Sequence, residues 1–229
     1  MKRIDYASAA RTLRAQADRA KAAIYRGYFK DVAGDLFLGI TTPALRRTAR
    51  EFWPMPLADV RLLMKSRIHE ERSLANEVLR LKFQKGGPQE QEQIFRFYIK
   101  NRGYICSWDC VDGSAPYIVG CYLLKRDKKL LYELAASPRT WDRRIAIVST
   151  WWFIRHGNVR DTLKLARMLL RDEEDLIHKA TGWMLREVGK QDLAALKNFL
   201  DSHAKVMPRT MLRYAIERFG ESERKKYLG

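Results

Sequence analysis

The chain has 229 residues, of which 46% are hydrophobic, so it can bury a sizeable core and is neither a disulfide-stapled miniprotein nor a disordered tail. Its 44 lysines and arginines outnumber its 27 acidic residues and give a net charge of +17, with an isoelectric point near 10.0. A charge of this size makes a polyanion the first partner to test, and nucleic acid leads an anionic membrane surface.

The N-terminal segment is basic and rich in alanine. Its first 28 residues include seven lysines and arginines, which predicts an amphipathic basic helix or a pair of helices. Such a segment could bind a membrane surface, but it lacks the tryptophan anchors of interfacial helices, which argues against membrane attachment. The N-terminus also has no signal-like apolar stretch, and no apolar run approaches the ~20 residues that cross a bilayer. We therefore expect a soluble, cytoplasmic protein without a membrane partner.

Helix start and stop signals punctuate the rest of the sequence. Two-residue alternation and Asn-Gly turns are almost absent, so we expect an all-α fold. Helix starts are predicted at Thr42-Pro43, Ser137-Pro138 and Met207-Pro208. Helix ends are predicted at Gly86-Gly87-Pro88, Gly157-Asn158, Gly189 and Gly220.

Similar segments recur along the chain, each beginning with charged residues and running into apolar ones. Their spacing, in the thirties if SWDCVDGSAPYIVG at 107 fills one gap, suits stacked helical pairs and predicts a curved α-solenoid of HEAT-like repeats that forms a single domain over residues 1–229. A basic residue near the start of each second helix would line one face as a phosphate track. The segments are HEERSLANEVL at 69, WDRRIAIVSTW at 141, HKATGWMLREV at 178 and PRTMLRYAIER at 208, with Arg72, Arg144, Lys179 and Arg209 as the equivalent residues.

Several kinds of site can be set aside. The three cysteines, Cys106, Cys110 and Cys121, and the four scattered histidines show no zinc-ligand spacing, so we expect no disulfide framework and no metal. The chain also has no Gly-rich phosphate loop, HExxH motif or GxSxG elbow, and we expect no organic cofactor.

The remaining candidate feature is tryptophan beside a carboxylate. Trp108 and Asp112 stand four residues apart, so on a helix they share a face. Trp183 follows Gly182, and a glycine that costs a helix about 1 kcal/mol indicates close approach to another part of the structure. Each feature also has a plain structural interpretation, because such a tryptophan is often core and an aspartate at a helix end often caps it. Spacing alone leaves these alternatives open.

Several ordered motifs give the chain a resemblance to a known family. They are FLGITTP at 37 followed by Arg46, WDCVD at 108, WDRRIA at 141 and GWMLRE at 182. In these the sequence resembles the AlkD-like DNA alkylation repair enzymes, which are alkylpurine DNA glycosylases built from HEAT-like repeats. Two departures stand out: Thr41 occupies a position where other members can carry a larger polar side chain, and residues 28–35 match the family pattern poorly.

The resemblance implies roles for particular residues. Asp112 would be the catalytic carboxylate, with Trp108 and Trp183 as aromatic walls beside the sugar of the damaged nucleotide. Arg144 would hold the DNA backbone. Further DNA-binding residues are expected at Lys179, Arg186, Arg209 and Arg46.

The expected chemistry needs one carboxylate. A purine alkylated at N3 or N7 is already cationic, so the base leaves without an acid, and an ionised Asp112 would stabilise the sugar cation and orient water. We predict a monomeric, monofunctional DNA-3-methyladenine/7-alkylguanine glycosylase of base excision repair that acts on duplex DNA. The alternatives are a HEAT-repeat protein that binds damaged or branched DNA without chemistry, and a protein-interaction solenoid. Glycosylases generally extrude the base into a pocket; the resemblance implies a base that stays stacked, which we expect here.

Overall fold

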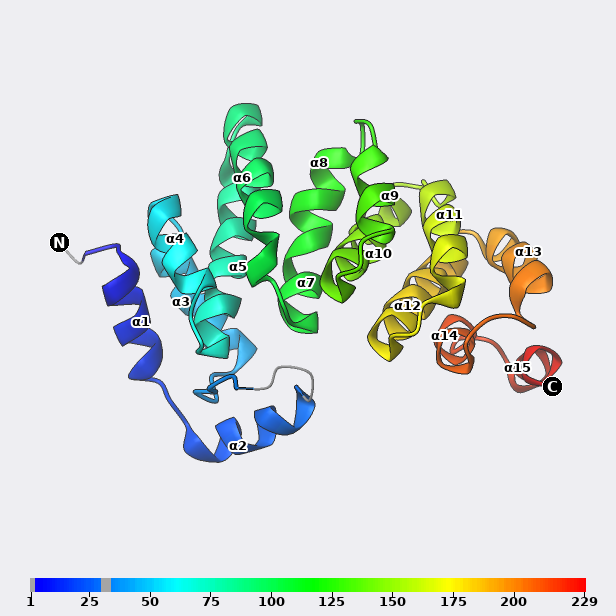
Figure 1. Ribbon diagram of the computed structural model, residues 1–229, viewed down its shortest axis with the longest axis horizontal. Coiled ribbons are helices and arrows are strands. Elements are labelled where there is room, and N and C mark those ends of the chain that lie inside the picture. Colours follow the sequence, from blue (N-terminus) through cyan, green and yellow to red (C-terminus); the bar gives the residue numbers. More distant parts are fainter. Residues whose placement is uncertain (1–2, 30–33) are drawn as a thin grey trace. The chain divides into compact units, whose positions relative to one another are not determined.

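The computed structural model describes residues 3–29 and 34–229, which fold almost entirely into helices (Figure 1). The prediction of an all-α fold is confirmed. The described residues contain no strand and only an isolated parallel bridge between Leu36 and Ile68. In the same residues, no helix combines the length and the apolar character that a bilayer span requires.

The chain divides into two compact units, Met1–Ile118 and Val119–Gly229. Each unit has its own buried apolar core. The expectation of a single repeat domain over residues 1–229 stays a prediction.

In the first unit the long helix α5 is central. It packs against α3, α4, α6 and α7, and its buried residues include a histidine and three charged side chains near its start as well as the apolar ones. The elements of this unit are α1 (Tyr6–Arg14), α2 (Arg19–Tyr28), α3 (Thr42–Phe52), α4 (Leu57–Met64), α5 (His69–Lys85), α6 (Pro88–Asn101), the 3-10 turn η1 (Arg102–Tyr104) and α7 (Trp108–Ala115), followed by the π-helical turn η2 (Pro116–Gly120).

Local sequence signals place most of these helix ends. The Asp5 carboxylate accepts the Ser8 N–H at 2.8 Å and so caps α1. Pro43 lies in the first turn of α3 and Gly86 ends α5, as predicted. The basic N-terminal segment forms the helix pair α1 and α2 rather than one helix.

Glu70 anchors the segment between α2 and α3 to the start of α5. Its buried carboxylate accepts the N–H groups of Leu38 at 2.9 Å, Gly39 at 2.7 Å and Ile40 at 3.3 Å. Gly39 has a φ of 78°, and a Cβ there would lie 2.2 Å from the Asp18 carbonyl oxygen, so only glycine fits. This contact holds the start of α2 close to the FLGI segment.

In the second unit α10 and α12 are central. α10 packs against α9, α11 and α12, and α12 packs in turn against α13 and α14, a succession typical of stacked helical pairs. The elements are α8 (Cys121–Leu123), α9 (Lys129–Ala135), α10 (Thr140–Arg155), α11 (Arg160–Met168), the 3-10 turn η3 (Leu169–Arg171), α12 (Asp175–Gln191), α13 (Leu193–His203), α14 (Arg209–Ala215) and α15 (Glu221–Leu228).

The glycine and proline signals of this unit are partly correct. Helix α14 begins at Arg209, directly after Pro208, as predicted. The prediction that Gly189 ends a helix is wrong, because α12 continues to Gln191. A Cβ on Gly189 would lie 2.4 Å from the Leu196 side chain, so this glycine makes room for α13 instead.

The recurring segments fall at the starts of α5, α10, α12 and α14, but their basic residues do not form an exposed row. Arg72 and Arg144 are only 4% and 5% exposed. The Arg72 guanidinium forms an ion pair with Asp35, and Arg144 donates to the Leu176 carbonyl oxygen at 2.6 Å. Arg72 and Arg144 therefore do not lie on an exposed row of cations, because a neighbouring segment of the same unit covers each guanidinium, and the DNA-binding role of Arg144 stays a prediction.

Candidate active site

Helix α7 carries the residues of the WDCVD motif. Its inner face is fixed by Ser114, whose hydroxyl donates to the Cys110 carbonyl oxygen at 2.5 Å and lies 2.9 Å from the Tyr98 hydroxyl. Trp108 and Asp112 lie one turn apart on the less buried side, as their spacing predicts. Burial raises the pKa of the Cys110 thiol, so this cysteine stays protonated and is not a nucleophile.

Trp108 and Asp112 line one cleft of about 640 Å³ in the first unit, a volume in the range of ligand-binding sites. Three arginines border the same cleft: Arg46 and Arg50 from α3, and Arg80 from α5. The structure therefore places the predicted carboxylate, the predicted indole and the predicted Arg46 at one site. Sequence reasoning missed Arg50 and Arg80, although the four-residue spacing of Arg46 and Arg50 on α3 was a usable signal.

The arginines of the cleft differ in how firmly they are held. Arg80 donates through Nε to Glu77 at 2.8 Å, and its Cζ lies 5.5 Å from the centroid of the Tyr117 ring. The hydrogen bond to Glu77 raises the pKa of Arg80. Arg46 is 59% exposed and its Nε lies 3.8 Å from the same carboxylate, while Arg50 is exposed. The cleft thus combines one firmly held cation, Arg80, with two long exposed side chains, Arg46 and Arg50, at its rim.

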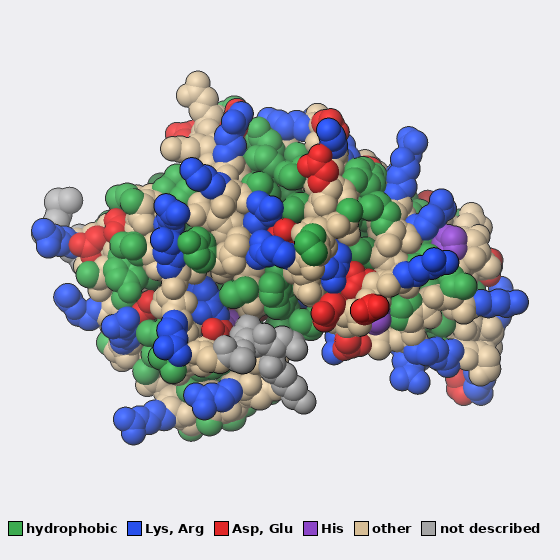
Figure 2. All heavy atoms as spheres, viewed as in Figure 1, with side chains coloured by type: hydrophobic (Ala, Val, Ile, Leu, Met, Phe, Trp, Pro, Cys, Tyr) green, Lys and Arg blue, Asp and Glu red, His purple; other side chains and the backbone are tan. Residues whose placement is uncertain are grey.

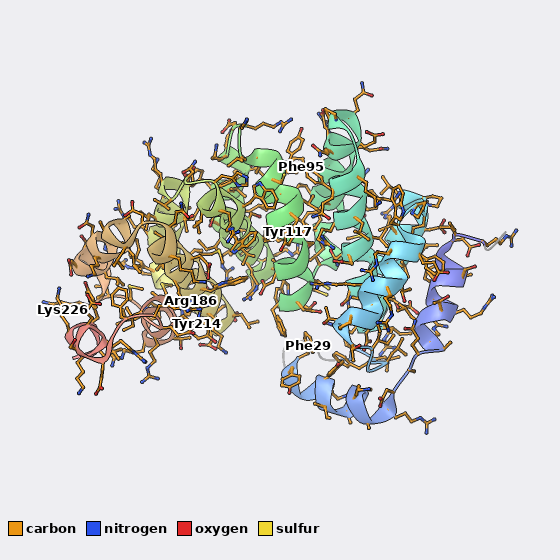
Figure 3. All side chains as sticks on the ribbon, turned by 180° about the vertical axis from the view of Figure 1, so that it is seen from behind. Phe29, Phe95, Tyr117, Arg186, Tyr214 and Lys226 are labelled. Atoms are coloured by element: carbon orange, nitrogen blue, oxygen red, sulfur yellow. The ribbon has the colours of Figure 1, made fainter. Side chains whose placement is uncertain are left out.

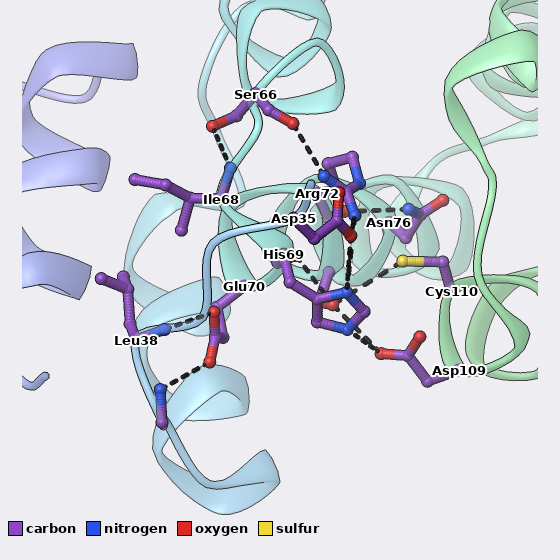
Figure 4. A network of polar contacts seen from close by, with 12 residues as sticks. Asp35, Leu38, Ser66, Ile68, His69, Glu70, Arg72, Asn76, Asp109 and Cys110 are labelled. Atoms are coloured by element: carbon purple, nitrogen blue, oxygen red, sulfur yellow. Dashed lines mark hydrogen bonds and ion pairs between the residues drawn. The ribbon is translucent and has the colours of Figure 1, made fainter. Parts of the chain in front are cut away.

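A polar network lies behind the cleft (Figure 4). His69 is 5% exposed at its side chain, and its Nε2 lies 2.9 Å from an Asp109 carboxylate oxygen that also accepts the Ser73 hydroxyl at 3.2 Å. The His69 Nδ1 lies 3.7 Å from Asp35, which pairs with Arg72. Burial by itself would raise the pKa of Asp109, but the hydrogen bond and charge of His69 hold this pKa below its usual range. Asp109 is therefore ionised at neutral pH.

The second unit holds the other predicted site residues, most of them on α12. Lys179, Trp183 and Arg186 are spaced by four and three residues and so lie along one side of this helix. Lys179 is 2.7 Å from the Asp175 carboxylate, and Arg186 forms an ion pair with Glu217 (Figure 3 labels Arg186).

Two further predicted DNA-binding residues of this unit lie on other helices. Arg209 begins α14 and is exposed; its guanidinium donates to the Leu228 carbonyl oxygen at 2.8 Å. Arg144 on α10 is buried, as described above. The roles expected for these residues stay predictions.

Gly182 lies where α12 and α14 come close together. A Cβ on Gly182 would lie 2.4 Å from the Met211 carbonyl oxygen and 2.6 Å from the Tyr214 Cβ. The glycine therefore lets α12 pack directly against the backbone of α14, which confirms the close approach predicted from the sequence.

Lysine and arginine side chains lie over the visible surface of both units (Figure 2). In the described residues no group of three or more His, Cys, Asp or Glu side chains could hold a metal ion, and no cysteine there forms a disulfide. Of the stretch 28–35 that departs from the family pattern, residues 30–33 lie outside the described part.

A helical scaffold that sets one indole and the carboxylates of Glu77, Asp109 and Asp112 in an arginine-bordered cleft defines a protein suited to phosphate-bearing ligands. Residues 9–219 match the family model described as DNA alkylation repair enzyme, and the chain belongs to this family. A solved structure described as "Predicted DNA alkylation repair enzyme from Enterococcus faecalis" is similar over 90% of this chain and 98% of that chain, with 18% identity and a TM-score of 0.72. At this identity the likeness shows the fold alone. A search of curated proteins finds no match.

The family match confirms the resemblance noted in the sequence. Membership of a DNA alkylation repair family supports a role in DNA repair and an enzymatic activity.

Proposed function

We propose that this protein is a monofunctional DNA glycosylase that hydrolyses the N-glycosidic bond of cationic alkylated purines, such as 3-methyladenine and 7-methylguanine, in duplex DNA. The observation that carries the proposal is the position of Asp112 beside Trp108 in an arginine-bordered cleft of the first unit. This arrangement places Asp112, together with Glu77 and Asp109, next to arginine side chains suited to a polyanion.

The reaction suits a single carboxylate. Water attacks C1′ of the deoxyribose, the glycosidic bond breaks, and its electron pair neutralises the positive charge of the departing purine. The sugar becomes cationic on the way, and Asp112 would stabilise that charge and take up the proton of the attacking water. Because the alkyl group has already activated the base, the step calls for no acid, metal or organic cofactor.

The aromatic and basic residues have separate tasks in this proposal. Trp108 would offer its electron-rich face to the cationic sugar. Arg46, Arg50 and Arg80 would hold phosphates around the cleft, and their positive charge draws the DNA backbone toward Asp112.

The second unit would add DNA contacts of its own. Trp183 would present another indole to the DNA, and the neighbouring basic residues would pair with phosphates. These are Arg144, Lys179, Arg186 and Arg209. The burial of Arg144 makes it the weakest of these candidates, because its guanidinium already donates to a carbonyl oxygen. The protein would act on DNA in the cytoplasm as a monomer.

The test is base release from methylated duplex DNA. The wild-type protein should liberate free 3-methyladenine and 7-methylguanine, measured by chromatography with mass detection, and Asp112→Asn should bind the same DNA without releasing bases. DNA binding without release by the wild-type protein would instead favour a non-catalytic reader of damaged or branched DNA.

DNA affinity itself has a separate test. Phosphate-driven binding should weaken steeply as the salt concentration rises. If no affinity is measurable at low salt, the chain is a protein-interaction module and the proposal fails.

A further inference from the structure

One face of the Trp108 indole is covered by a ring at the end of α2. The Phe29 ring, which directly follows α2 and is labelled in Figure 3, stacks on the indole with centroids 5.2 Å apart and planes 9° from parallel. Trp108 lines two neighbouring hollows of the first unit, the cleft of Asp112 and a pocket of about 380 Å³. Of these two, Phe29 lines only the pocket, so the part of the indole that lines the cleft is not the part that Phe29 covers.

Two further rings hold Phe29 in place. Its centroid lies 5.4 Å from that of Phe37 and 4.3 Å from that of the His69 imidazole, and the centroids of Phe37 and His69 are 4.9 Å apart. Aromatic rings at separations near 5 Å attract one another through their quadrupoles as well as through the area that they bury. Phe29, Phe37, His69 and Trp108 therefore form one continuous group, which we call the ring cluster.

The ring cluster is fixed on the side away from α2. The His69 side chain is 5% exposed, and its Nε2 lies 2.9 Å from the Asp109 carboxylate on α7. Phe37 precedes Leu38, whose N–H donates to the buried Glu70 carboxylate at 2.9 Å. By contrast, none of the residues of α2 is buried. The ring cluster thus joins the exposed helix α2 to the start of α7 through aromatic contacts on a fixed base.

The stacked contact limits how the indole can turn. Trp108 is the first residue of α7 and is only partly buried. An indole rotates about two single bonds, so it has several rotamers unless packing selects one of them. A ring that lies flat against one face loses that contact when the indole turns about either bond. The Phe29 contact therefore favours a single orientation of Trp108.

We propose that Phe29 is a positioning residue for Trp108, and that its ring selects the indole orientation that lines the cleft beside Asp112. The orientation matters for the proposed function, because a displacement of about 1 Å in a reacting site can cost about 10²-fold in rate. The effect on the reaction rests on the proposed function, whereas the orientation of the indole is a property of the folded chain alone. A residue outside the cleft then controls a side chain inside it.

The orientation of Trp108 is tested by ¹⁹F NMR of protein labelled with 5-fluorotryptophan. Trp108→Phe identifies the Trp108 resonance among those of the six tryptophans. The wild type should give one narrow Trp108 resonance. Phe29→Leu should split this resonance or broaden it at least about twofold, because the indole then samples more than one rotamer. A resonance that stays single and equally narrow in a folded Phe29→Leu protein would overturn the proposal.

Three further variants separate stacking from other effects of the substitution. Tyr28→Leu removes the neighbouring ring, which is 66% exposed, and should leave the Trp108 resonance narrow. Phe29→Tyr keeps the stacked ring and should also give one narrow resonance. Phe29→Met removes the ring but keeps an apolar side chain, so it takes the place of Phe29→Leu if that protein does not fold. Equal broadening in Tyr28→Leu or Phe29→Tyr would show a general loosening of this segment and contradict a role for the stacked ring.

Base release from methylated DNA reports the same change in the reaction. Phe29→Leu should lower the single-turnover rate of release about tenfold and change the affinity for the same DNA less than about twofold, because the orientation of Trp108 changes while the DNA-binding residues remain. Phe29→Tyr should recover the rate. A loss of affinity with an unchanged rate would contradict the positioning role, because it would mean that Phe29 acts on DNA binding alone.

The failure of this proposal differs from the failure of the proposed function. The NMR measurement needs neither DNA nor a reaction, so it decides the contact of Phe29 with Trp108 even if the wild-type protein releases no base. Conversely, a wild-type rate of base release by a Phe29→Leu protein with a broadened Trp108 resonance would leave the glycosylase standing and overturn the positioning role of Phe29.

Discussion

Helix α7 of the first unit and helix α12 of the second each carry a tryptophan with a carboxylate one turn after it, but the residues around the two carboxylates differ. On α7, Asp112 follows Trp108 by one turn. On α12, Glu187 follows Trp183 by one turn and forms an ion pair with Lys190 at 2.5 Å, while Lys179 precedes Trp183 by one turn and lies 2.7 Å from the Asp175 carboxylate. A carboxylate stabilises a sugar that becomes positive, whereas a lysine binds phosphate. Under the proposed function, the comparison favours Asp112 on α7 for the chemistry and a DNA-holding role for α12.

The largest expected effect separates these roles. Asp112→Asn should lower the rate of base release about 10²- to 10³-fold, because it removes a preorganised charge and leaves the shape unchanged. Single-turnover release from methylated DNA measures this. Asp59→Asn in the first turn of α4 is the control and should keep the wild-type rate. A variant at Asp112 that keeps more than a tenth of the rate would move the chemistry away from α7.

The two helices also contain glycines whose replacement should act in opposite directions. Gly182→Ala should destabilise the protein by about 1–3 kcal/mol, because the new Cβ meets the α14 backbone. Gly113→Ala on α7 meets nothing within 4 Å and should stabilise its helix by up to about 1 kcal/mol. Urea denaturation followed by circular dichroism measures the free energy of unfolding of both variants. Equal changes in the free energy of unfolding for the two variants would contradict the packing difference between α7 and α12.

The network behind α7 should make the stability of the first unit depend on pH. The pKa of Asp109 is lowered in the folded protein, so its charge stabilises the fold above the ordinary aspartate pKa of about 3.9, and this contribution is lost as the pH falls through the folded value. Asp109→Asn should therefore cost about 1–3 kcal/mol at neutral pH, and the cost should shrink in acid. Denaturation midpoints of both proteins at several pH values give the difference. A stability difference between the wild-type and Asp109→Asn proteins that grows in acid would contradict a stabilising role for the Asp109 charge.

The smallest effect concerns the tryptophan of α12. Trp183→Ala should weaken DNA binding by about tenfold and change the rate of base release from bound DNA less, because under the proposed function its indole would contact the DNA without supplying the charge. Fluorescence anisotropy and single-turnover rates, measured on the same DNA, separate the two quantities. Trp183→Phe, which keeps a ring, should recover part of the affinity. A lower rate of base release with unchanged DNA affinity would mean that α12 also takes part in the chemistry.

Much of the fold could be predicted because its signals are local. The positions of proline and glycine predicted several helix ends, and the apolar periodicity predicted the all-α fold. The four-residue spacing of Trp108 and Asp112 gave their common helix face. The family match confirmed the resemblance that the short motifs carried.

The structure corrected predictions that depended on neighbours distant in sequence. Gly189 reads as a helix stop, but it lies inside α12 because the Leu196 side chain packs against it. Arg144 reads as a surface cation, but a carbonyl oxygen of the next repeat segment accepts its hydrogen bond.

The sequence by itself determined the helical class, the basic charge and the order of the motifs, because these follow from composition and from spacing along one helix. Only the tertiary structure decided which charges are accessible and which aromatic rings share a pocket. Tyr25 and Trp108 lie on separate helices, yet they line the same pocket of about 380 Å³. Such contacts are set by the packing of whole helices, which no local pattern encodes.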